Sequence, residues 1–420
     1  MGPSGILPGS DPGRLDLHSK QSGGKQPTSP VAPTRNHAKD RATMTIPAGL
    51  LPEGLRDRLP PQAEAASRLM HRTIVAIGRH GYARVSPPLA EFEESLVGRL
   101  KAARAQDLLR MVDPVSQRML ALRPDMTAQV GRIAATRMAH SPRPLRLAYG
   151  GQVVKLRATQ LRPERELAQV GAELIGRDTV AAAIEILNVA LDALAAAGVT
   201  DATIDLTLPD LVDTLAGGAL PLPAGRAEEV RELLDAKDAG GLAAAGADAY
   251  LPLLSACGPL DTALARLRAC AGLEILDSRL AGIEAIAAAI GHRATLTLDP
   301  TERHGFEYQS WIGFSFFGGG LTGEIGRGGS YALMHDDGSE EPAIGFSLYL
   351  DPLVDIGLGV EPARRIFLPL GHDPVAAMAL RREGWITIAA LDETDDPSAL
   401  GCDHSFEQGA PVAVAVVARG

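Results

Sequence analysis

Cysteine and aromatic residues are both scarce in this chain of 420 residues. Cys257, Cys270 and Cys402 are the only cysteines, which excludes a disulfide framework and any cysteine-rich zinc or iron–sulfur site. The same scarcity fits a reducing compartment, so we expect a cytoplasmic protein. Phe, Trp and Tyr make up 4% of the residues, so the core must consist mainly of Leu, Ala, Val and Ile.

Positive charge and long apolar runs are lacking as well. The chain has 41 Lys and Arg against 51 Asp and Glu, which gives a net charge of −10. A general nucleic-acid binder needs the opposite balance to neutralise phosphates, although a local basic groove stays compatible with this composition. No apolar run approaches the roughly 20 residues that cross a bilayer, so we expect no membrane-spanning segment.

The motifs of several enzyme classes are missing too. There is neither a Gly-x-Ser-x-Gly elbow nor a phosphate-binding P-loop, which leaves hydrolase and NTPase functions without support. The ten histidines are scattered without ligand-like spacing, and Cys402-Asp403-His404 has no second ligand pair. We therefore expect no metal site and no cofactor.

Composition divides the chain into a tail, a core and a C-terminal segment. Residues 1–43 are rich in Gly, Pro and Ser and contain no aromatic residue, so we expect a disordered tail and take Met44 as the native start. Residues 44–356 form the predicted core, with an Ala- and Leu-rich helical insertion at about 210–290. Residues 357–420 predict a small α/β segment.

Apolar spacing predicts the elements of the core. One helix begins near Pro61, and a longer one begins near residue 178, carries one apolar stripe and ends at Gly198. Two strands, 145–156 and 167–175, are expected to pair antiparallel, with a bend at Gly150-Gly151 in the first. Further strands are expected at 119–123, 202–208, 294–298, 306–317, 323–325, 343–350, 366–370, 386–390 and 412–417. Runs of strands without strict β-α alternation indicate an α+β fold, with an antiparallel sheet flanked by helices.

Four segments, in order along the chain, resemble the motifs of class II aminoacyl-tRNA synthetases, and of histidyl-tRNA synthetase in particular. Residues 81–89 resemble the first motif, whose proline (Pro88 here) lies at the dimer interface. Residues 122–128, with the sequence LRPDMTA, resemble the loop that holds the substrate histidine. The segments 149–173 and 342–353 are similar to the second and third motifs. The resemblance covers roughly residues 48–356 and implies a class II synthetase-like core.

The departures from this family fall where a synthetase binds ATP. The arginine that holds the α-phosphate is replaced by Lys155, which keeps the charge but loses the planar bidentate fork. The acidic position on the adenine side is Arg157, and the arginine that clamps the γ-phosphate is Pro352. Losing charge-assisted contacts of about 1.5–3 kcal/mol each would cripple adenylate formation. The resemblance therefore implies a degenerate ATP site at these three positions.

The amino-acid half of the site resembles the synthetase more closely. Asp125, Thr127, Gln169 and Glu173 stand at the positions that hold histidine, although Asp125 is one methylene shorter than the usual glutamate. The histidine-specific loop is matched by two further residues, Glu307 and Tyr308. The resemblance thus implies that these six residues bind histidine.

The C-terminal segment decides between family members. Only 64 residues (420 − 356) follow the third motif, and they are not basic, whereas histidyl-tRNA synthetase carries a longer anticodon-binding domain there. The combination resembles the regulatory subunits of ATP phosphoribosyltransferase, the enzyme of the first step of histidine biosynthesis. That resemblance implies a non-catalytic subunit that assembles with a short-form catalytic subunit. It also implies feedback inhibition by L-histidine, a homodimer within a hetero-oligomer, and no tRNA partner.

Plainer interpretations stay open at this point. Asp125 and Thr127 are also suitable helix caps, Glu173 could merely pair with an arginine, and Tyr308 could pack in the sheet. Arg157 could belong to a solvated loop or touch a partner. For the whole chain, the alternatives are an active histidyl-tRNA synthetase and a scaffold that binds no histidine.

Overall fold

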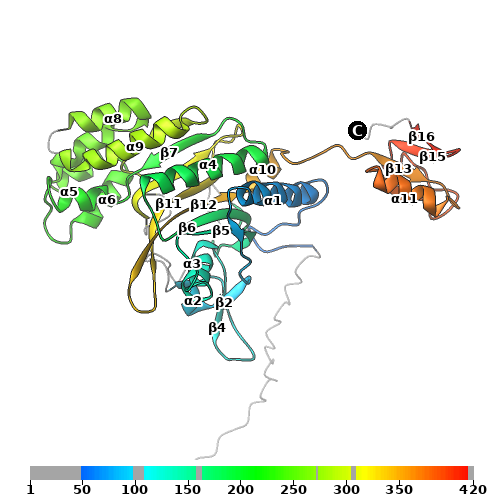
Figure 1. Cartoon of the computed structure of the whole chain (residues 1–420), viewed down its shortest axis with the longest axis horizontal. Coiled ribbons are helices and arrows are strands. Elements are labelled where there is room, and N and C mark those ends of the chain that lie inside the picture. The colour runs from blue at the N-terminus through cyan, green and yellow to red at the C-terminus, as the bar shows by residue number, and fades with distance from the viewer. Residues whose placement is uncertain (1–48, 98–107, 158–162, 271–272, 304–308, 415–420) are drawn as a thin grey trace, which may run out of the picture. The chain divides into compact units, whose positions relative to one another are not determined.

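The computed structural model describes residues 49–97, 108–157, 163–270, 273–303 and 309–414 (Figure 1). The predicted tail over residues 1–43 lies outside this part of the chain.

A nine-stranded sheet forms the framework of the molecule. Two neighbouring pairs, β1 with β5 and β7 with β9, run parallel, and the other neighbours run antiparallel, which confirms the predicted α+β fold. The strands in spatial order are β1 (Ala83–Arg84), β5 (Leu145–Val154), β6 (Glu166–Ile175), β12 (Glu340–Tyr349), β11 (Gly326–Met334), β10 (Gln309–Phe317), β7 (Thr203–Thr207), β9 (Thr295–Leu298) and β8 (Gly258–Pro259).

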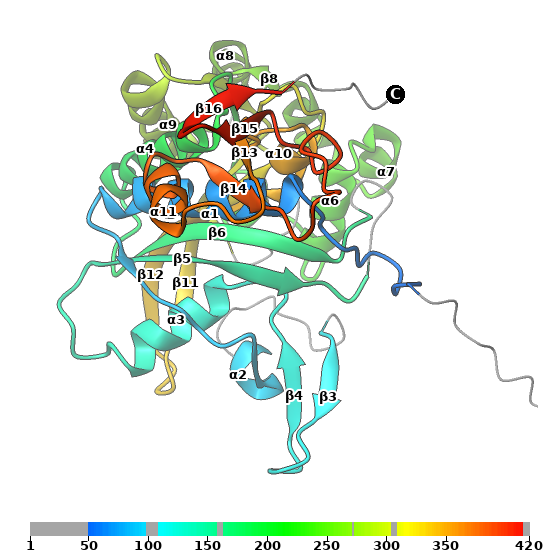
Figure 2. The ribbon, with the colours of Figure 1, turned by 90° about the vertical axis from the view of Figure 1, so that its right-hand side faces the viewer.

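Helices cover the two faces of the sheet differently. α1 (Gln62–Gly78) and α4 (Val180–Ala197) pack on one face, and α3 (Thr127–Thr136) packs on the other (Figure 2). Side chains alternate along β6 accordingly: Ala168, Val170 and Ala172 enter the core beneath α1 and α4. Because neighbouring side chains on a strand point to opposite faces, Gln169 and Glu173 lie on the α3 face.

α4 ends where its sequence predicts and begins two residues later than expected, at Val180. Thr179 caps its first turn by accepting a hydrogen bond from the Ala182 N–H, and Gly198 ends it in the left-handed conformation that glycine adopts readily. The predicted single stripe is too narrow, because residues such as Ile186 and Val189 outside that stripe are also fully buried. By length and composition this helix could cross a membrane, but 56% of it is buried inside the structure.

Two sequence predictions about strands in this sheet need correction. No bend occurs at Gly150-Gly151, since β5 continues through both residues. The missing side chain at Gly150 instead admits α1: a Cβ there would lie 2.6 Å from the Met70 sulfur. The strand expected at 323–325 begins only at Gly326, where pairing with β12 starts.

The strands of a small three-stranded sheet directly precede α3 in the chain. It consists of β2 (Ala90–Phe92), β4 (Met119–Leu122) and β3 (Arg110–Val112), and the short α2 (Glu93–Val97) follows β2. β4 and α3 occupy the places that the sequence predicts, on either side of Pro124.

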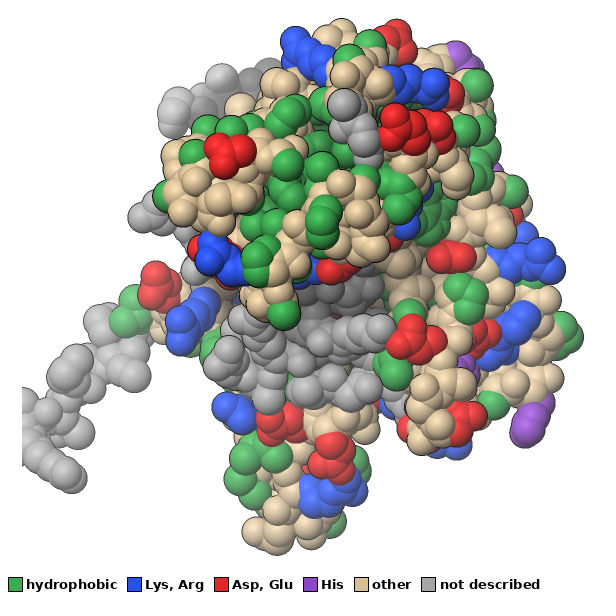
Figure 3. Space-filling model, turned by 90° about the vertical axis from the view of Figure 1, so that its left-hand side faces the viewer, with side chains coloured by type: hydrophobic (Ala, Val, Ile, Leu, Met, Phe, Trp, Pro, Cys, Tyr) green, Lys and Arg blue, Asp and Glu red, His purple; other side chains and the backbone are tan. Residues whose placement is uncertain are grey.

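The segment between β7 and β9 is mostly helical. Its outer face, seen in Figure 3, shows many apolar side chains over the insertion. The elements are α5 (Leu211–Ala216), α6 (Ala227–Asp235), α7 (Ala239–Ala244), η2 (Asp248–Ser255), α8 (Leu260–Ala269), η3 (Glu274–Leu276) and α9 (Asp277–Ile290), with β8 between η2 and α8.

The C-terminal segment has a four-stranded sheet of its own in the order β14-β13-β15-β16, beside α11 (Pro374–Arg382). The strands are β13 (Arg365–Leu368), β14 (Ile386–Ala389), β15 (His404–Glu407) and β16 (Ala410–Ala413). Sequence reasoning missed β15 and placed β16 too late, at residues 412–417, of which 415–417 lie outside the described residues.

Candidate functional site

Four of the predicted residues meet on the α3 face of the sheet. Asp125 precedes α3, Thr127 is its first residue, and Gln169 and Glu173 lie on β6. The buried amide of Gln169 connects the two elements. Its Nε2 donates to Asp125 Oδ2 at 2.5 Å, and its Oε1 accepts from the Met126 backbone N–H at 3.0 Å. The half-buried Asp125 and the fully buried β6 residues therefore belong to one hydrogen-bonded cluster.

Glu173 is only 1% exposed and is held by two tyrosines. Its oxygens accept from the hydroxyls of Tyr149 at 3.0 Å and Tyr331 at 2.8 Å. Burial raises the pKa of Glu173 to about 8, against hydrogen bonds from both tyrosines and Thr127 that lower it. This carboxyl therefore carries a proton in part of the molecules near neutral pH, and can donate as well as accept. The alternative that Glu173 merely pairs with an arginine is wrong.

Sequence reasoning did not single out Tyr149 and Ser347 as site residues. The Tyr149 hydroxyl lies 2.9 Å from Ser347 Oγ and 3.3 Å from Thr127 Oγ1, so it joins three strands and α3. Burial keeps its pKa well above the ordinary value, so the hydroxyl stays protonated. The available signal is that a buried tyrosine needs a hydrogen-bond partner for its hydroxyl.

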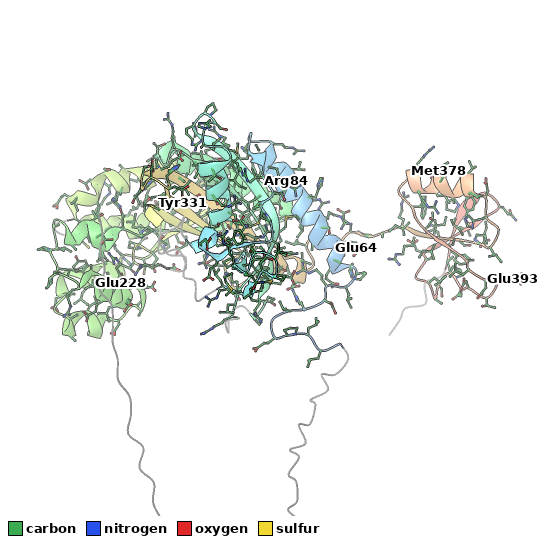
Figure 4. All side chains as sticks on the ribbon, turned by 90° about the horizontal axis from the view of Figure 1, so that it is seen from below. Glu64, Arg84, Glu228, Tyr331, Met378 and Glu393 are labelled. Atoms are coloured by element: carbon green, nitrogen blue, oxygen red, sulfur yellow. The ribbon has the colours of Figure 1, made fainter. Side chains whose placement is uncertain are left out.

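Tyr331 comes from β11, where Figure 4 labels it within the sheet, whereas Glu228, also labelled, lies on α6 of the insertion. Sequence reasoning did not name Tyr331 as a binding residue. Its hydroxyl contact with Glu173 crosses 158 residues of sequence, which is why no local pattern indicates it.

Glycines on the α3 face leave room for this cluster. Gly345 pairs with Glu173 across β12 and β6, and a Cβ there would overlap the Glu173 carboxyl and lie 2.7 Å from the Ala172 carbonyl oxygen. A Cβ at Gly171 would lie 2.5 Å from the Tyr149 hydroxyl. Small residues in the strands are therefore a condition for the buried polar network.

Asp125 combines a local and a site role. Its Oδ1 accepts from the Thr127 backbone N–H at 2.7 Å, as a helix-terminal residue does, while its Oδ2 accepts from Gln169. The helix itself begins after Met126, which provides no side-chain cap. Each carboxylate oxygen can accept more than one hydrogen bond, so Asp125 keeps capacity for a ligand.

The three predicted ATP-site positions lie just after β5 and in the first turn of α10 (Asp351–Asp355). Lys155 follows β5, with its Nζ 5.5 Å from the ring centre of Tyr349. Arg157 is exposed. Pro352 lies beside Asp351, which accepts from the Ala168 N–H at 2.6 Å and pairs with Arg58. An acidic residue that is already paired thus lies directly before Pro352.

The remaining predicted residues can be placed only in part. Pro88 is exposed, and its carbonyl accepts from the amide Nε2 of Gln129 at 2.8 Å, so α3 contacts the predicted dimer segment. Glu307 and Tyr308 lie outside the described residues. Within the described ranges, no group of three or more His, Cys, Asp or Glu residues is arranged to hold a metal ion.

Comparison with known proteins extends this picture. The family model described as histidyl-tRNA synthetase matches residues 54–353. An ATP phosphoribosyltransferase regulatory subunit of Rhodospirillum centenum is 45% identical over 370 residues, covering 86% of this chain and 95% of the relative. The protein of the same name from Paramagnetospirillum magneticum is 42% identical, covering 84% of this chain and 95% of the relative.

Solved structures agree on the fold. A protein from Bacillus halodurans, described as an ATP phosphoribosyltransferase regulatory subunit/histidyl-tRNA synthetase, superposes with a TM-score of 0.69 at 24% identity, covering 84% of this chain and 96% of that one. Histidyl-tRNA synthetase from Nostoc sp. also gives 0.69, at 15% identity, covering 85% and 90%. Both similarities show a class II synthetase fold. The sequence relatives establish that the chain belongs to the family of ATP phosphoribosyltransferase regulatory subunits.

Proposed function

We propose that this chain is a non-catalytic, histidine-sensing subunit of a cytoplasmic ATP phosphoribosyltransferase in histidine biosynthesis. It assembles with a short-form catalytic subunit, is needed for that subunit's activity, and mediates inhibition by L-histidine. Two copies pair through the segment around Pro88 within the hetero-oligomer. The names of the curated relatives support the partnership with a catalytic subunit.

The observation that carries the proposal is the contrast between the two halves of the site. On the amino-acid side, Asp125 offers a carboxylate to an ammonium group, and Glu173 with Tyr331 offers a polar end for an imidazole. These groups already hydrogen-bond to one another through Gln169 and Tyr149. Since groups held in place lose little freedom on binding, such a network suits a small polar ligand.

The nucleotide side offers much less to a triphosphate. Of the three positions compared, Lys155 is a point charge, Arg157 is exposed and Pro352 has neither charge nor N–H. The neighbouring Asp351 pairs with Arg58, so this arginine is already engaged and the pair offers no net positive charge to phosphate. Histidine binding without adenylate formation is the chemistry that this arrangement favours.

Calorimetry tests the proposal directly. The full chain should bind L-histidine but not ATP, and Gln169→Ala should weaken histidine binding by about tenfold or more, because it removes a buried hydrogen-bonded partner of Asp125. Gln152→Ala is the matched control, since Gln152 is an exposed amide on the adjacent β5. ATP binding without histidine binding would contradict the proposal.

Inhibition of the assembled enzyme provides the second test. With the catalytic subunit present, histidine should inhibit the wild-type complex, and Glu173→Ala should abolish that inhibition. If inhibition persists unchanged in Gln169→Ala and Glu173→Ala, the pocket does not sense histidine and the chain acts as a scaffold.

The match to the histidyl-tRNA synthetase model keeps ligase activity as the second candidate. Histidine-dependent pyrophosphate exchange distinguishes the two, since only a ligase forms an adenylate. A robust exchange rate in the purified chain would favour the ligase.

A further inference from the structure

Among the arginines that the structure describes, Arg123 is unusual because it lies in the interior. It is only 6% exposed, and burial lowers the pKa of its guanidinium. The guanidinium donates to two backbone carbonyls: Nε to the Gln152 oxygen at 2.7 Å, and Nη1 to the Pro87 oxygen at 3.0 Å. A cation is buried at considerable cost, so hydrogen bonds of this kind must define its position closely.

The backbone of Arg123 joins the same two segments. Its N–H donates to the Leu89 carbonyl at 3.1 Å, and its carbonyl accepts from the Val154 N–H at 2.9 Å. A single residue therefore makes four hydrogen bonds, two to residues 87–89 and two to the end of β5. Gly151 leaves room for it, since a Cβ there would overlap the guanidinium.

Arg123 is also directly connected to the candidate histidine site. Only Pro124 separates it from Asp125, and the fixed φ of proline limits how far the two residues can move independently. Asp125 is held on its other side by Gln169. A ligand that binds to Asp125 and shifts it therefore also shifts Arg123, because the φ of Pro124 between them is fixed.

The other end of this connection reaches the surface. Pro88 is exposed and Leu89 is 48% exposed, while Pro87, the residue before them, is buried. The carbonyls of Pro87 and Leu89 face Arg123, so these two exposed side chains belong to a segment whose backbone Arg123 holds.

We infer that Arg123 is a positioning residue that couples histidine binding at the proposed site to the pairing of two copies of this chain through residues 87–89. The inference rests on the proposed function, which supplies histidine as the ligand and the Pro88 segment as the pairing surface. Coupling of this kind is reciprocal: if histidine changes the dimer affinity, dimerisation changes the histidine affinity by the same factor.

Sedimentation velocity of the full chain, with and without saturating histidine, measures the coupling. In the wild type, histidine should change the dimer dissociation constant by about fivefold or more, in the range typical of coupled sites. Arg123→Lys keeps the charge but cannot bridge two carbonyls with a planar fork, so the ratio should fall below about twofold. Arg279→Lys is the matched control, because Arg279 pairs with Asp210 at the start of the insertion, and it should keep the wild-type ratio.

Gly151→Ala provides a second variant, which displaces the guanidinium without removing it and should also reduce the ratio. It decides the question if Arg123→Lys fails to fold. Calorimetry on the same samples measures histidine binding separately from its effect on dimer affinity. If the wild type does not bind histidine, the proposed function fails. If it binds histidine, but either the wild type shows no change in dimer affinity or the folded variants keep the full change, the role of Arg123 is refuted.

Discussion

At the scale of single residues, Glu173 places an ionisable carboxyl where water does not reach it. Tyrosine hydroxyls replace the lost hydration in part, but they do not offset the burial that raises its pKa to about 8. A residue of this kind is tolerated in a core only when it has a function or a fully satisfied network. Glu173 has such a network, and its titration can be followed in the stability of the protein.

We predict that Glu173→Gln makes stability less dependent on pH. Between the ordinary pKa near 4.5 and about 8, the folded protein holds more proton on Glu173 than the unfolded chain does. The free energy of unfolding therefore falls as pH rises through this window, by at most about 1.4 kcal/mol per pH unit for one group. Urea unfolding from about pH 5 to pH 8 should show a shallower fall in the variant. Glu166→Gln, at the exposed start of β6, is the control, and parallel curves for Glu173→Gln and the wild type would contradict the prediction.

A second prediction concerns the charge of Asp125. Asp125→Asn keeps an oxygen that can accept from the Thr127 N–H but removes the negative charge offered to an ammonium group. We expect histidine affinity to fall by about 10- to 100-fold, the loss of one charge-assisted hydrogen bond of about 1.5–3 kcal/mol, measured by calorimetry. Asp113→Asn is a close control, since Asp113 accepts from the Val115 N–H in a similar local turn. Equal affinities in both variants would remove Asp125 from the site.

At the scale of elements, the sheet has to bring three strands close enough for their side chains to share hydrogen bonds. β6, β12 and β11 meet side by side, and Gly345 lies directly opposite Glu173. The polar cluster therefore depends on Gly345, although this residue has no side chain with which to make a hydrogen bond in the site.

We predict that Gly345→Ala destabilises the protein and removes histidine binding together. The added Cβ would lie 2.7 Å from the Ala172 carbonyl oxygen, where backbone must shift, and would displace the Glu173 carboxyl. Overpacking of this kind costs about 1–3 kcal/mol of unfolding free energy. Gly323→Ala is the control, because a Cβ at Gly323 would meet no atom within 4 Å. A variant with unchanged urea midpoint and unchanged histidine affinity would show that the sheet accommodates the methyl group.

The sequence predicts these elements well where the signal is local. The apolar stripe and the cap residues of α4 define its bounds, and the alternation along β6 places Gln169 and Glu173 on one face. β11 is poorly predicted, since its glycines have low strand propensity and its bounds depend on pairing with β10 and β12. Such pairing is non-local information.

The same distinction applies to the site. Asp125, Thr127, Gln169 and Glu173 are predictable through motif resemblance, and the structure brings them together. Tyr149 escapes because a tyrosine in a strand fits equally well in a core, and only the position of its hydroxyl next to Ser347 distinguishes the two. Arg123 escapes because its partners are backbone carbonyls, which no residue pattern reveals.

At the scale of the whole molecule, the proposed assembly requires a surface through which two copies of the chain can pair. Leu89 is 48% exposed beside the exposed Pro88, and the carbonyls of residues 87–89 are held from inside the molecule. An apolar side chain on a well-supported backbone is a suitable contact for a second copy, since little freedom is lost when it is covered.

We predict that Leu89→Glu weakens the proposed homodimer without unfolding the chain. Each copy would bring an unpaired charge into the interface in place of an apolar side chain, so the dimer dissociation constant should rise by about tenfold or more in sedimentation experiments. The fold should tolerate the change, because substitutions at exposed positions usually alter stability by about 0.5 kcal/mol or less. Leu370→Glu, at a 55% exposed position in the C-terminal segment, is the control and should leave dimer affinity unchanged.

The melting temperature provides a second measurement of the same effect. Because dimerisation stabilises the folded state by mass action, the melting temperature of the wild type should rise with protein concentration, and that of Leu89→Glu should rise less. A dimer that survives Leu89→Glu with wild-type affinity would place the pairing surface elsewhere on the molecule.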